Sequence, residues 1–220
     1  GDLEQEQAAV NWFGDAFFDR FAAATPREIL RAAEEKRNQS ADPSPPSDLQ
    51  EKFDERRLRA NVAPAMAEEK EDDLGKGLLM VLRLLCHELD LPEDVDFQVD
   101  TNFAGGRNYP TLHARLRLVF RAEGDREFHV CVRVLQKNHH SAFRARLDSA
   151  MVEAGIDRGL PFRKLLLFRS TDQTPRGART QELVETFRNR GGEFHRFEEA
   201  DVAVVRALLE LAKESGDGFE

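Results

Sequence analysis

Basic side chains recur along Tyr109–Lys137, a stretch in which apolar and polar residues alternate. Arg115, Arg117 and Arg133 fall on polar positions of this alternation, and Lys137 closes it. The planar fork of an arginine matches phosphate oxygens, and a lysine adds a compact positive charge. The residue types therefore predict a phosphate-contacting face, and we expect these four side chains to bind DNA there.

A second set of polar residues lies where a strand is expected to end and a helix to begin. Asn138 and Ser141 flank the pair His139-His140, and Arg176 opens a later helix. Backbone N–H groups and a serine hydroxyl at a helix start can bind an anion, so Asn138, Ser141 and Arg176 form a candidate anion site. The alternative is an ordinary capped helix start. The two histidines lack a third ligand nearby in the sequence, so no metal site is predicted.

Two neighbouring strands must position the basic residues. Leu112–Phe120 and Phe128–Val134 alternate with a period of two, which indicates strands with one buried face. Glu123–Asp125 supplies turn residues between them, so an antiparallel hairpin is expected. Cys86 and Cys131 fall inside a helical and a strand pattern, without a partner at metal-ligand spacing, and we interpret both as small buried hydrophobic residues.

Helix and strand patterns alternate around this hairpin. Gly77–Leu89 is apolar on more than one face and predicts a buried helix, and Asp94–Phe103 alternates like a short strand. The patterns that follow the hairpin predict a helix at Ser141–Ala154, a buried strand at Leu165–Phe168, a helix at Thr174–Arg190, a strand at Glu193–Phe197 and a helix at Ala200–Lys213. The expected fold class is α/β, with a helical N-terminal extension followed by an αβββαβαβα domain built on a mixed central sheet.

Composition and charge narrow the class of protein. The 220 residues are 40% hydrophobic and 33% charged, which suits one sizeable core. We find neither an apolar run that would span a bilayer nor a signal-like leader, so we expect a cytoplasmic protein that does not bind membranes. The formal charge is -9, but residues 1–73 carry 10 Lys and Arg against 18 Asp and Glu, whereas 74–214 carry 22 against 21. Acidity in the first third does not exclude a nucleic-acid partner for the remainder.

The first third is expected to be mostly helical. Leu3–Ala24 has a helical stripe with heavy aromatic loading, which must pack on the chain, on a partner protein or on a second copy of the chain. The aromatic residues expected to dock are Trp12, Phe13, Phe17 and Phe21. Thr25–Glu28 forms a capping box that begins a second helix. We expect a helical hairpin at 1–37, an acidic linker with one charged helix at 38–73, the α/β domain at 74–214 and a disordered tail at 215–220.

The phenylalanine-rich helix followed by TPREIL resembles the end of the helical lid in bacterial P-loop ATPases of the AAA+ type. This resemblance implies that Arg27 could reach a nucleotide phosphate. No G-x-x-x-x-G-K-[ST] loop occurs in the sequence, so the chain cannot hydrolyse ATP by that means and no cofactor is predicted. The resemblance implies a C-terminal part of a larger ATPase that carries an appended domain.

The order α-β-β-β-α-β over Leu74–Ser170 resembles the core of the restriction-endonuclease-like nucleases, whose signature is PD-(D/E)xK. In that family two acids hold Mg²⁺ and a lysine assists the chemistry. The matching positions here are Pro110-Thr111 and Cys131-Val132-Arg133, so Thr and Cys replace the acids. The resemblance therefore implies a catalytically degenerate nuclease fold with no catalytic and no metal-binding residue.

Several functions stay open at this point. The favoured one is a non-catalytic nuclease-fold module that binds DNA or a protein partner in a bacterial DNA-processing or phage-defence assembly. One alternative is a metal-dependent nuclease with a displaced site at Asp100, Glu127 and Lys137, although the last two begin and end one strand about 30 Å apart. Another is an architectural protein-interaction domain, and a Rossmann-like α/β domain without nuclease ancestry also remains.

Overall fold

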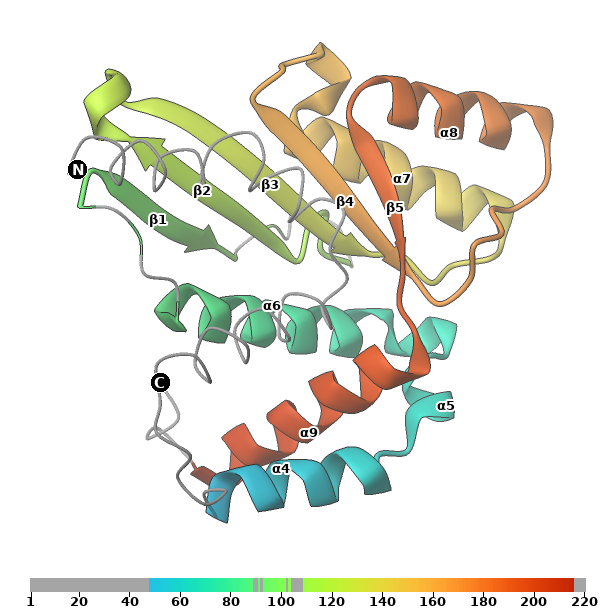
Figure 1. Ribbon diagram of the computed structural model, residues 1–220. Helices are drawn as coiled ribbons and strands as arrows, with labels where there is room; N and C mark the ends of the chain where they lie inside the picture. Colours follow the sequence, from blue (N-terminus) through green and yellow to red (C-terminus); the bar gives the residue numbers. More distant parts are fainter. Residues whose placement is uncertain (1–47, 89–90, 92, 102, 104–108, 216–220) are drawn as a thin grey trace.

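The computed structural model describes residues 48–88, 91, 93–101, 103 and 109–215 (Figure 1). The helical hairpin expected at 1–37, with its aromatic residues and Arg27, lies outside the described residues. So do the Pro-rich part of the expected linker and residues 216–220 of the expected tail. The described residues therefore comprise the charged helix and the α/β domain.

The described residues form one five-stranded mixed sheet whose strands lie side by side in chain order (Figure 1). The strands are β1 (Val95–Asp100), β2 (Ala114–Phe120), β3 (Arg126–Val134), β4 (Arg163–Arg169) and β5 (Gly192–Arg196). β1, β2 and β3 are antiparallel neighbours, and β4 and β5 continue parallel to β3. The expected hairpin is confirmed, since Leu116 of β2 lies opposite Val130 of β3.

The hairpin turn uses the residues that its tight geometry requires. A short 3-10 helix, η2 (Arg121–Glu123), follows β2 and ends at Gly124, whose φ is 70°. Asp125 also has a positive φ, 59°, which an aspartate tolerates better than a branched residue would. β3 then begins at the next residue.

Helices cover both faces of the sheet, so the domain has three layers (Figure 1). α6 (Glu71–Glu88) and α9 (Glu199–Ser215) pack on one face, and α7 (His140–Ala154) and α8 (Ala178–Asn189) pack on the other. Strands buried on both faces need apolar residues at every position, which explains the run Leu165–Phe168 in β4. The predicted α/β architecture is confirmed.

β2 shows how alternation divides the two layers. Leu116 and Leu118 are buried in the core beneath α6 and α9. Arg115 and Arg117 point to the opposite face, where they stay partly exposed. The core beneath α7 and α8 is built instead from residues such as Cys131, Phe143 and Phe187. The interpretation of Cys131 as a buried small residue is confirmed, whereas the side chain of Cys86 lies outside the described part.

Residues 62–73 belong to the stretch 38–73 that was expected to be an acidic linker, and they are ordered against the domain. They form α5 (Val62–Ala65), a 3-10 helix η1 (Glu68–Lys70) and the first turn of α6. α6 therefore begins at Glu71, six residues earlier than its apolar pattern indicates. The physical reason is a tertiary one, because Glu71 is buried beside a cation from β3. At the other end of the domain, α8 begins at Ala178 after Gly177, four residues later than expected.

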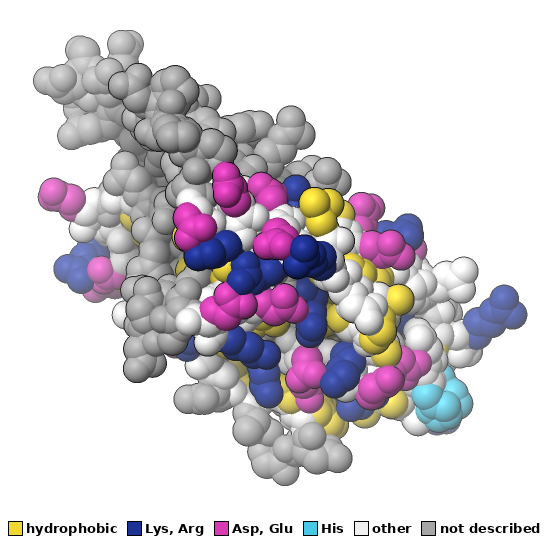
Figure 2. Space-filling model, turned by 90° about the horizontal axis from the view of Figure 1, so that it is seen from below, with side chains coloured by type: hydrophobic (Ala, Val, Ile, Leu, Met, Phe, Trp, Pro, Cys, Tyr) yellow, Lys and Arg dark blue, Asp and Glu magenta, His cyan; other side chains and the backbone are white. Residues whose placement is uncertain are grey.

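The charged helix expected within 38–73 is present as α4 (Asp48–Arg59), and it lies along α9. Arg56 of α4 forms an ion pair with Glu214 of α9. On the face seen from below, Lys and Arg side chains are interspersed with Asp and Glu (Figure 2). Exposed ion pairs of this kind stabilise a fold only slightly. No described helix has both the length and the apolar character that crossing a membrane would require.

Candidate functional site

A buried ion-pair cluster lies where α6, β3 and α7 meet. The Arg133 side chain is fully buried on β3, and its Nη2 donates to Glu71 Oε1. Its Nη1 donates to Pro110 O at 2.6 Å. Arg146 of α7 donates from Nε to the same Glu71 oxygen at 3.0 Å. We call Glu71, His113, Arg133 and Arg146 the Glu71 cluster.

The carboxylate of Glu71 is well compensated despite its burial. Its second oxygen, Oε2, accepts the backbone N–H of Gln136 at 2.7 Å. Glu71 is also the first residue of α6, where the helix dipole favours a negative charge. A carboxylate with three N–H donors has little acceptor capacity left, so it is a poor ligand for a further ion.

His113, the residue just before β2, completes the cluster. Its Nδ1 accepts the backbone N–H of Val134 at 3.0 Å, so the neutral ring carries its proton on Nε2. Nε2 lies 3.5 Å from Asp72 Oδ1 and 3.2 Å from Arg133 Nη1. Burial, reinforced by the Arg133 charge, lowers the pKa of His113 to about 4. The hydrogen bond from His113 lowers the pKa of Asp72 below its ordinary value.

Two further contacts hold the cluster in place. The Arg146 guanidinium lies 4.3 Å from the centroid of the Tyr109 ring, a cation–π contact. Gly75 lets α6 approach the sheet, since a Cβ at this position would overlap the His113 ring. The cluster thus depends on a small residue in α6 as much as on its charges.

A second buried arginine joins the carboxyl ends of β3 and β4. Arg169 Nη1 donates to Leu135 O at 2.7 Å, and Nη2 donates to Asn138 Oδ1 at 3.1 Å. Gln136 Oε1 accepts the N–H and the hydroxyl of Ser170, at 3.1 and 2.8 Å. Desolvation lowers the pKa of Arg169 to about 10, so the group stays charged at neutral pH. The two strand ends are therefore fixed by internal hydrogen bonds.

The residues of the candidate anion site have other partners. Asn138 gives its side-chain oxygen to Arg169, and its N–H donates to Glu68 Oε1 at 3.2 Å. Ser141 Oγ lies 2.9 Å from His139 Nδ1 near the start of α7. Arg176 is exposed in the loop before α8, and no contact in the described part joins it to Asn138 or Ser141. Asn138 and Ser141 are thus engaged within the fold, and the grouping of all three residues as one anion site stays a prediction.

Arg115 and Arg117 lie on the sheet face opposite α6 and α9. Arg115 Nη2 donates to Glu153 O at 2.8 Å, and Arg163 Nη1 donates to Ala154 O at 3.2 Å. Both guanidinium groups thus satisfy the last carbonyls of α7, where positive charge also complements the helix dipole. Arg117 donates to the side-chain oxygen of Gln98.

Only some of the four cations that were predicted to share a DNA-binding face lie together on an accessible surface. Arg115 and Arg117 remain together on an accessible face, but Arg133 is fully buried and ion-paired, so the prediction that it contacts phosphate is wrong. The sequence pattern could not reveal that an acid from α6 would neutralise it. Lys137 lies three residues beyond the end of β3, whereas Arg117 lies opposite His129, the fourth residue of that strand. The two cations are therefore separated by about eight residues of extended chain, roughly 26 Å.

The two positions that match the nuclease acids hold neutral side chains, one hydrogen-bonded within the fold and one fully buried. Thr111 Oγ1 donates to Phe103 O at 2.9 Å. Cys131 is fully buried, and burial raises the pKa of its thiol. Asp100 of β1 lies opposite Arg115 of β2, and Arg115 lies opposite Cys131 of β3. Cys131 is four residues from Glu127 in one direction and six residues from Lys137 in the other, so neither residue lies level with Asp100. The structure therefore does not bring together the displaced site of Asp100, Glu127 and Lys137.

Three members of the cluster, Glu71, His113 and Arg146, were not expected from the sequence as site residues. The signal that could have revealed them is Arg133 itself, since an arginine within the apolar run VCVRVL needs a buried acid. Within the described residues, no three His, Cys, Asp or Glu side chains are grouped as metal ligands. No family model matches the chain, and no curated protein or solved structure is significantly similar to it.

Proposed function

We propose that residues 74–214 are a catalytically inactive, restriction-endonuclease-like module that binds DNA within a bacterial DNA-processing or phage-defence assembly. One observation carries the proposal. The three positions that match the nuclease signature hold Thr111, Cys131 and Arg133, and the charge of Arg133 is already neutralised by Glu71. The order of α6, β1 to β3, α7 and β4 supports it, because that is the order the resemblance implies.

The Glu71 cluster argues for a structural rather than a catalytic role of this region. A divalent metal ion would have to displace the guanidinium groups of Arg133 and Arg146 from the Glu71 carboxylate. That exchange would leave a buried arginine without its counter-ion, which costs several kcal/mol. We therefore expect the cluster to exclude a metal ion at the position where the resemblance implies metal chemistry.

The surface that we assign to DNA is an outer-face cluster of Arg115, Arg117, His129, Phe162 and Arg163. The Phe162 side chain is 37% exposed, and its ring lies edge-on to that of His129 with centroids 6.1 Å apart. The Arg163 guanidinium lies 5.6 Å from the Phe162 centroid. An exposed ring beside guanidinium groups is suited to a stacked base and its phosphate. The arrangement favours single-stranded DNA.

The outer-face cluster retains some capacity for an anion, because the side chains of Arg115 and Arg117 are 18% and 33% exposed. The Nε atoms of Arg115, Arg117 and Arg163 have no hydrogen-bond partner in the described part of the chain, but they are buried, so a phosphate would meet the outer guanidinium nitrogens. Glu127 lies 3.8 Å from Arg117, and Glu153 lies 3.5 Å from Arg115, so the positive charge is partly offset. We therefore expect binding that depends on a few phosphate contacts and weakens with salt.

The test combines a cleavage assay with a binding assay on the full chain. Plasmid and single-stranded DNA are incubated with Mg²⁺, Mn²⁺ or chelator, and a labelled oligonucleotide is titrated at two salt concentrations. We expect no cleavage and salt-sensitive binding that Phe162→Ala weakens about tenfold, as expected for the loss of one base-stacking contact. Arg117→Gln should lower the slope of log affinity against log salt by about one. Arg179→Gln, an exposed change on α8, is the matched control.

Two results would count against this proposal. Metal-dependent cutting that persists through further purification would contradict the inactive-nuclease assignment. The outer-face cluster would be ruled out as a DNA site if the unmodified chain did not bind DNA even at low salt. It would also be ruled out if Phe162→Ala and the control Arg179→Gln bound DNA equally well. Either result would leave a protein partner as the proposed occupant.

A further inference from the structure

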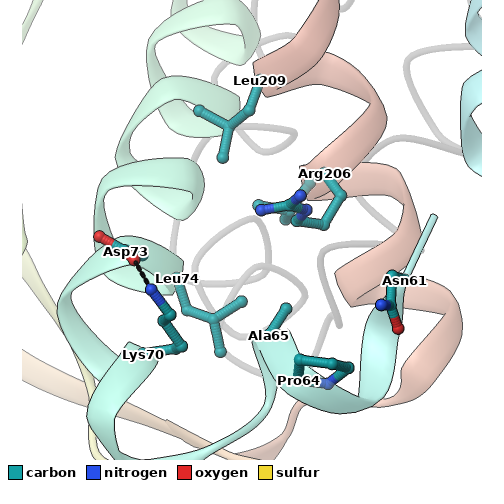
Figure 3. Close-up of a pocket in the computed structure, with 9 residues that line it drawn as sticks. Asn61, Pro64, Ala65, Lys70, Asp73, Leu74, Arg206 and Leu209 are labelled. Carbon is teal, nitrogen blue, oxygen red and sulfur yellow. Dashed lines mark hydrogen bonds and ion pairs between the residues drawn. The ribbon is translucent and has the colours of Figure 1, made fainter.

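A cavity of about 240 Å³ lies between α5, the start of α6 and α9 (Figure 3). Its apolar wall is formed by Pro64, Ala65, Leu74, Val205 and Leu209. Its polar lining is formed by Asn61, Lys70, Asp73 and Arg206. The cavity uses no residue of the Glu71 cluster or of the outer-face cluster.

The cavity has a local cause in the packing of α6 against α9. The helices touch at Gly77, where a Cβ would overlap Val205. One turn earlier α6 carries Leu74, and the space between Leu74 and α9 is closed by the single-turn helix α5 rather than by a longer element. A hollow with an apolar floor and a charged rim is left between the three helices.

The polar groups at the rim include donors with spare capacity. Arg206 forms a loose, partly exposed ion pair with Glu210, with Nη2 and Oε1 3.6 Å apart, beyond hydrogen-bond distance. Its Nε is buried, so only the outer guanidinium nitrogens can meet a ligand in the cavity. The Lys70 ammonium donates one bond to Asp73, at 3.2 Å, and keeps two further N–H groups. The lining holds two cations and one carboxylate, and Glu210 outside the lining offsets the charge of Arg206. An anionic ligand is therefore favoured by charge-assisted hydrogen bonds from the outer nitrogens of Arg206 and not by a net positive charge.

We propose that this cavity binds a small amphipathic carboxylate, with its apolar part against Leu74 and Leu209 and its carboxylate at Arg206. The volume suits a ligand of roughly eight non-hydrogen atoms, because a water-sized group occupies about 30 Å³ in the liquid. A ligand in this place contacts α5, α6 and α9 together, so it also stabilises the packing of α5 on the domain. This site is independent of the proposed DNA-binding function.

The probe is hexanoate, titrated into the full chain and followed by ligand-observed NMR, with hexanol as its uncharged counterpart. We expect a Kd near 1 mM for hexanoate, a value that is reasonable for about eight non-hydrogen atoms, and at least about tenfold weaker binding of hexanol. Arg206→Gln should weaken hexanoate binding about tenfold, as one charge-assisted hydrogen bond predicts, without changing the binding of hexanol. Arg179→Gln should leave both unchanged.

A second variant tests the location without altering charge. Ala65→Phe places a ring in the cavity, and it should abolish binding of both probes while urea unfolding confirms that the variant is folded. The proposal is overturned by equal affinities for hexanoate and hexanol, by hexanoate binding that neither variant changes, or by no binding up to about 10 mM, since about eight atoms in a matched cavity should bind below that limit.

Discussion

At the scale of single residues, Arg133 is the position on which the interior depends most. It is fully buried, and its charge is balanced by Glu71 with a further contribution from Asp72, 3.8 Å away. Desolvation lowers the pKa of Arg133 and the neighbouring acids oppose that shift. A buried pair of this kind is costly to break, although it adds little compared with an apolar pair of the same volume.

Glu71→Gln removes the counter-ion and leaves the Arg133 charge buried. We expect the free energy of unfolding to fall by about 3–5 kcal/mol, the usual result of breaking a buried ion pair. Urea denaturation followed by circular dichroism measures the change. Glu69→Gln, an exposed neutralisation two residues earlier, is the control and should change stability by less than about 0.5 kcal/mol. Similar values for the two variants would contradict the assigned role of Glu71.

His113 should make the fold sensitive to mild acid. Its pKa is about 4 in the folded chain and 6.5 in the unfolded chain, so the unfolded chain takes up the proton first as pH falls. The stabilisation is complete above pH 6.5 and is lost as the pH falls toward 4, by about 3 kcal/mol for this shift. Asp72 acts in the same direction but at lower pH, because its pKa falls below 3.8.

The measurement for His113 is the free energy of unfolding at several pH values between 7 and 4. We expect His113→Asn to have a shallower pH dependence in that window than the unmodified chain. Some dependence should remain, because burial also lowers the pKa of His129. An unchanged slope in the variant would show that His113 is not the responsible group.

At the scale of elements, glycines set how closely α6 approaches its neighbours. Gly75 faces the His113 ring, and Gly77 faces Val205 and Leu209 of α9. A glycine in a helix is normally unfavourable by about 1 kcal/mol relative to alanine. Close packing reverses that preference here, because no room exists for an additional methyl group.

Gly77→Ala should destabilise the domain despite the better helix propensity of alanine. We expect overpacking against Val205 to lower the free energy of unfolding by about 1–3 kcal/mol. The better helix propensity of alanine offsets part of that loss. Lys76→Ala, one residue away and exposed, is the control and should be neutral or slightly stabilising. Thermal unfolding of both variants measures the difference, and a stabilised Gly77→Ala would show that α6 and α9 can separate without cost.

At the scale of the whole molecule, the sequence predicts the layers well and the cluster poorly. Alternation in Leu112–Phe120 and the apolar run in Leu165–Phe168 locate β2 and β4 because each strand's pattern reflects which faces are covered. Periodicity could not place Glu71, since an acid in the stretch EEKEDD has the composition of an exposed helix start. Its burial depends on Arg133, 62 residues later, and only the folded chain brings them together.

The order of the strands has a consequence for how the chain folds during synthesis. Neighbouring strands follow one another in the sequence, so β1 to β5 can pair as they emerge from a ribosome. α9 follows the last strand in the sequence, yet it contributes to the same core as α6. It also packs against α4, where Arg56 pairs with Glu214, 158 residues later in the chain. Until α9 is made, the side of α6 that faces Val205 and Leu209 stays uncovered, and we expect the nascent chain to be most vulnerable to aggregation in that interval.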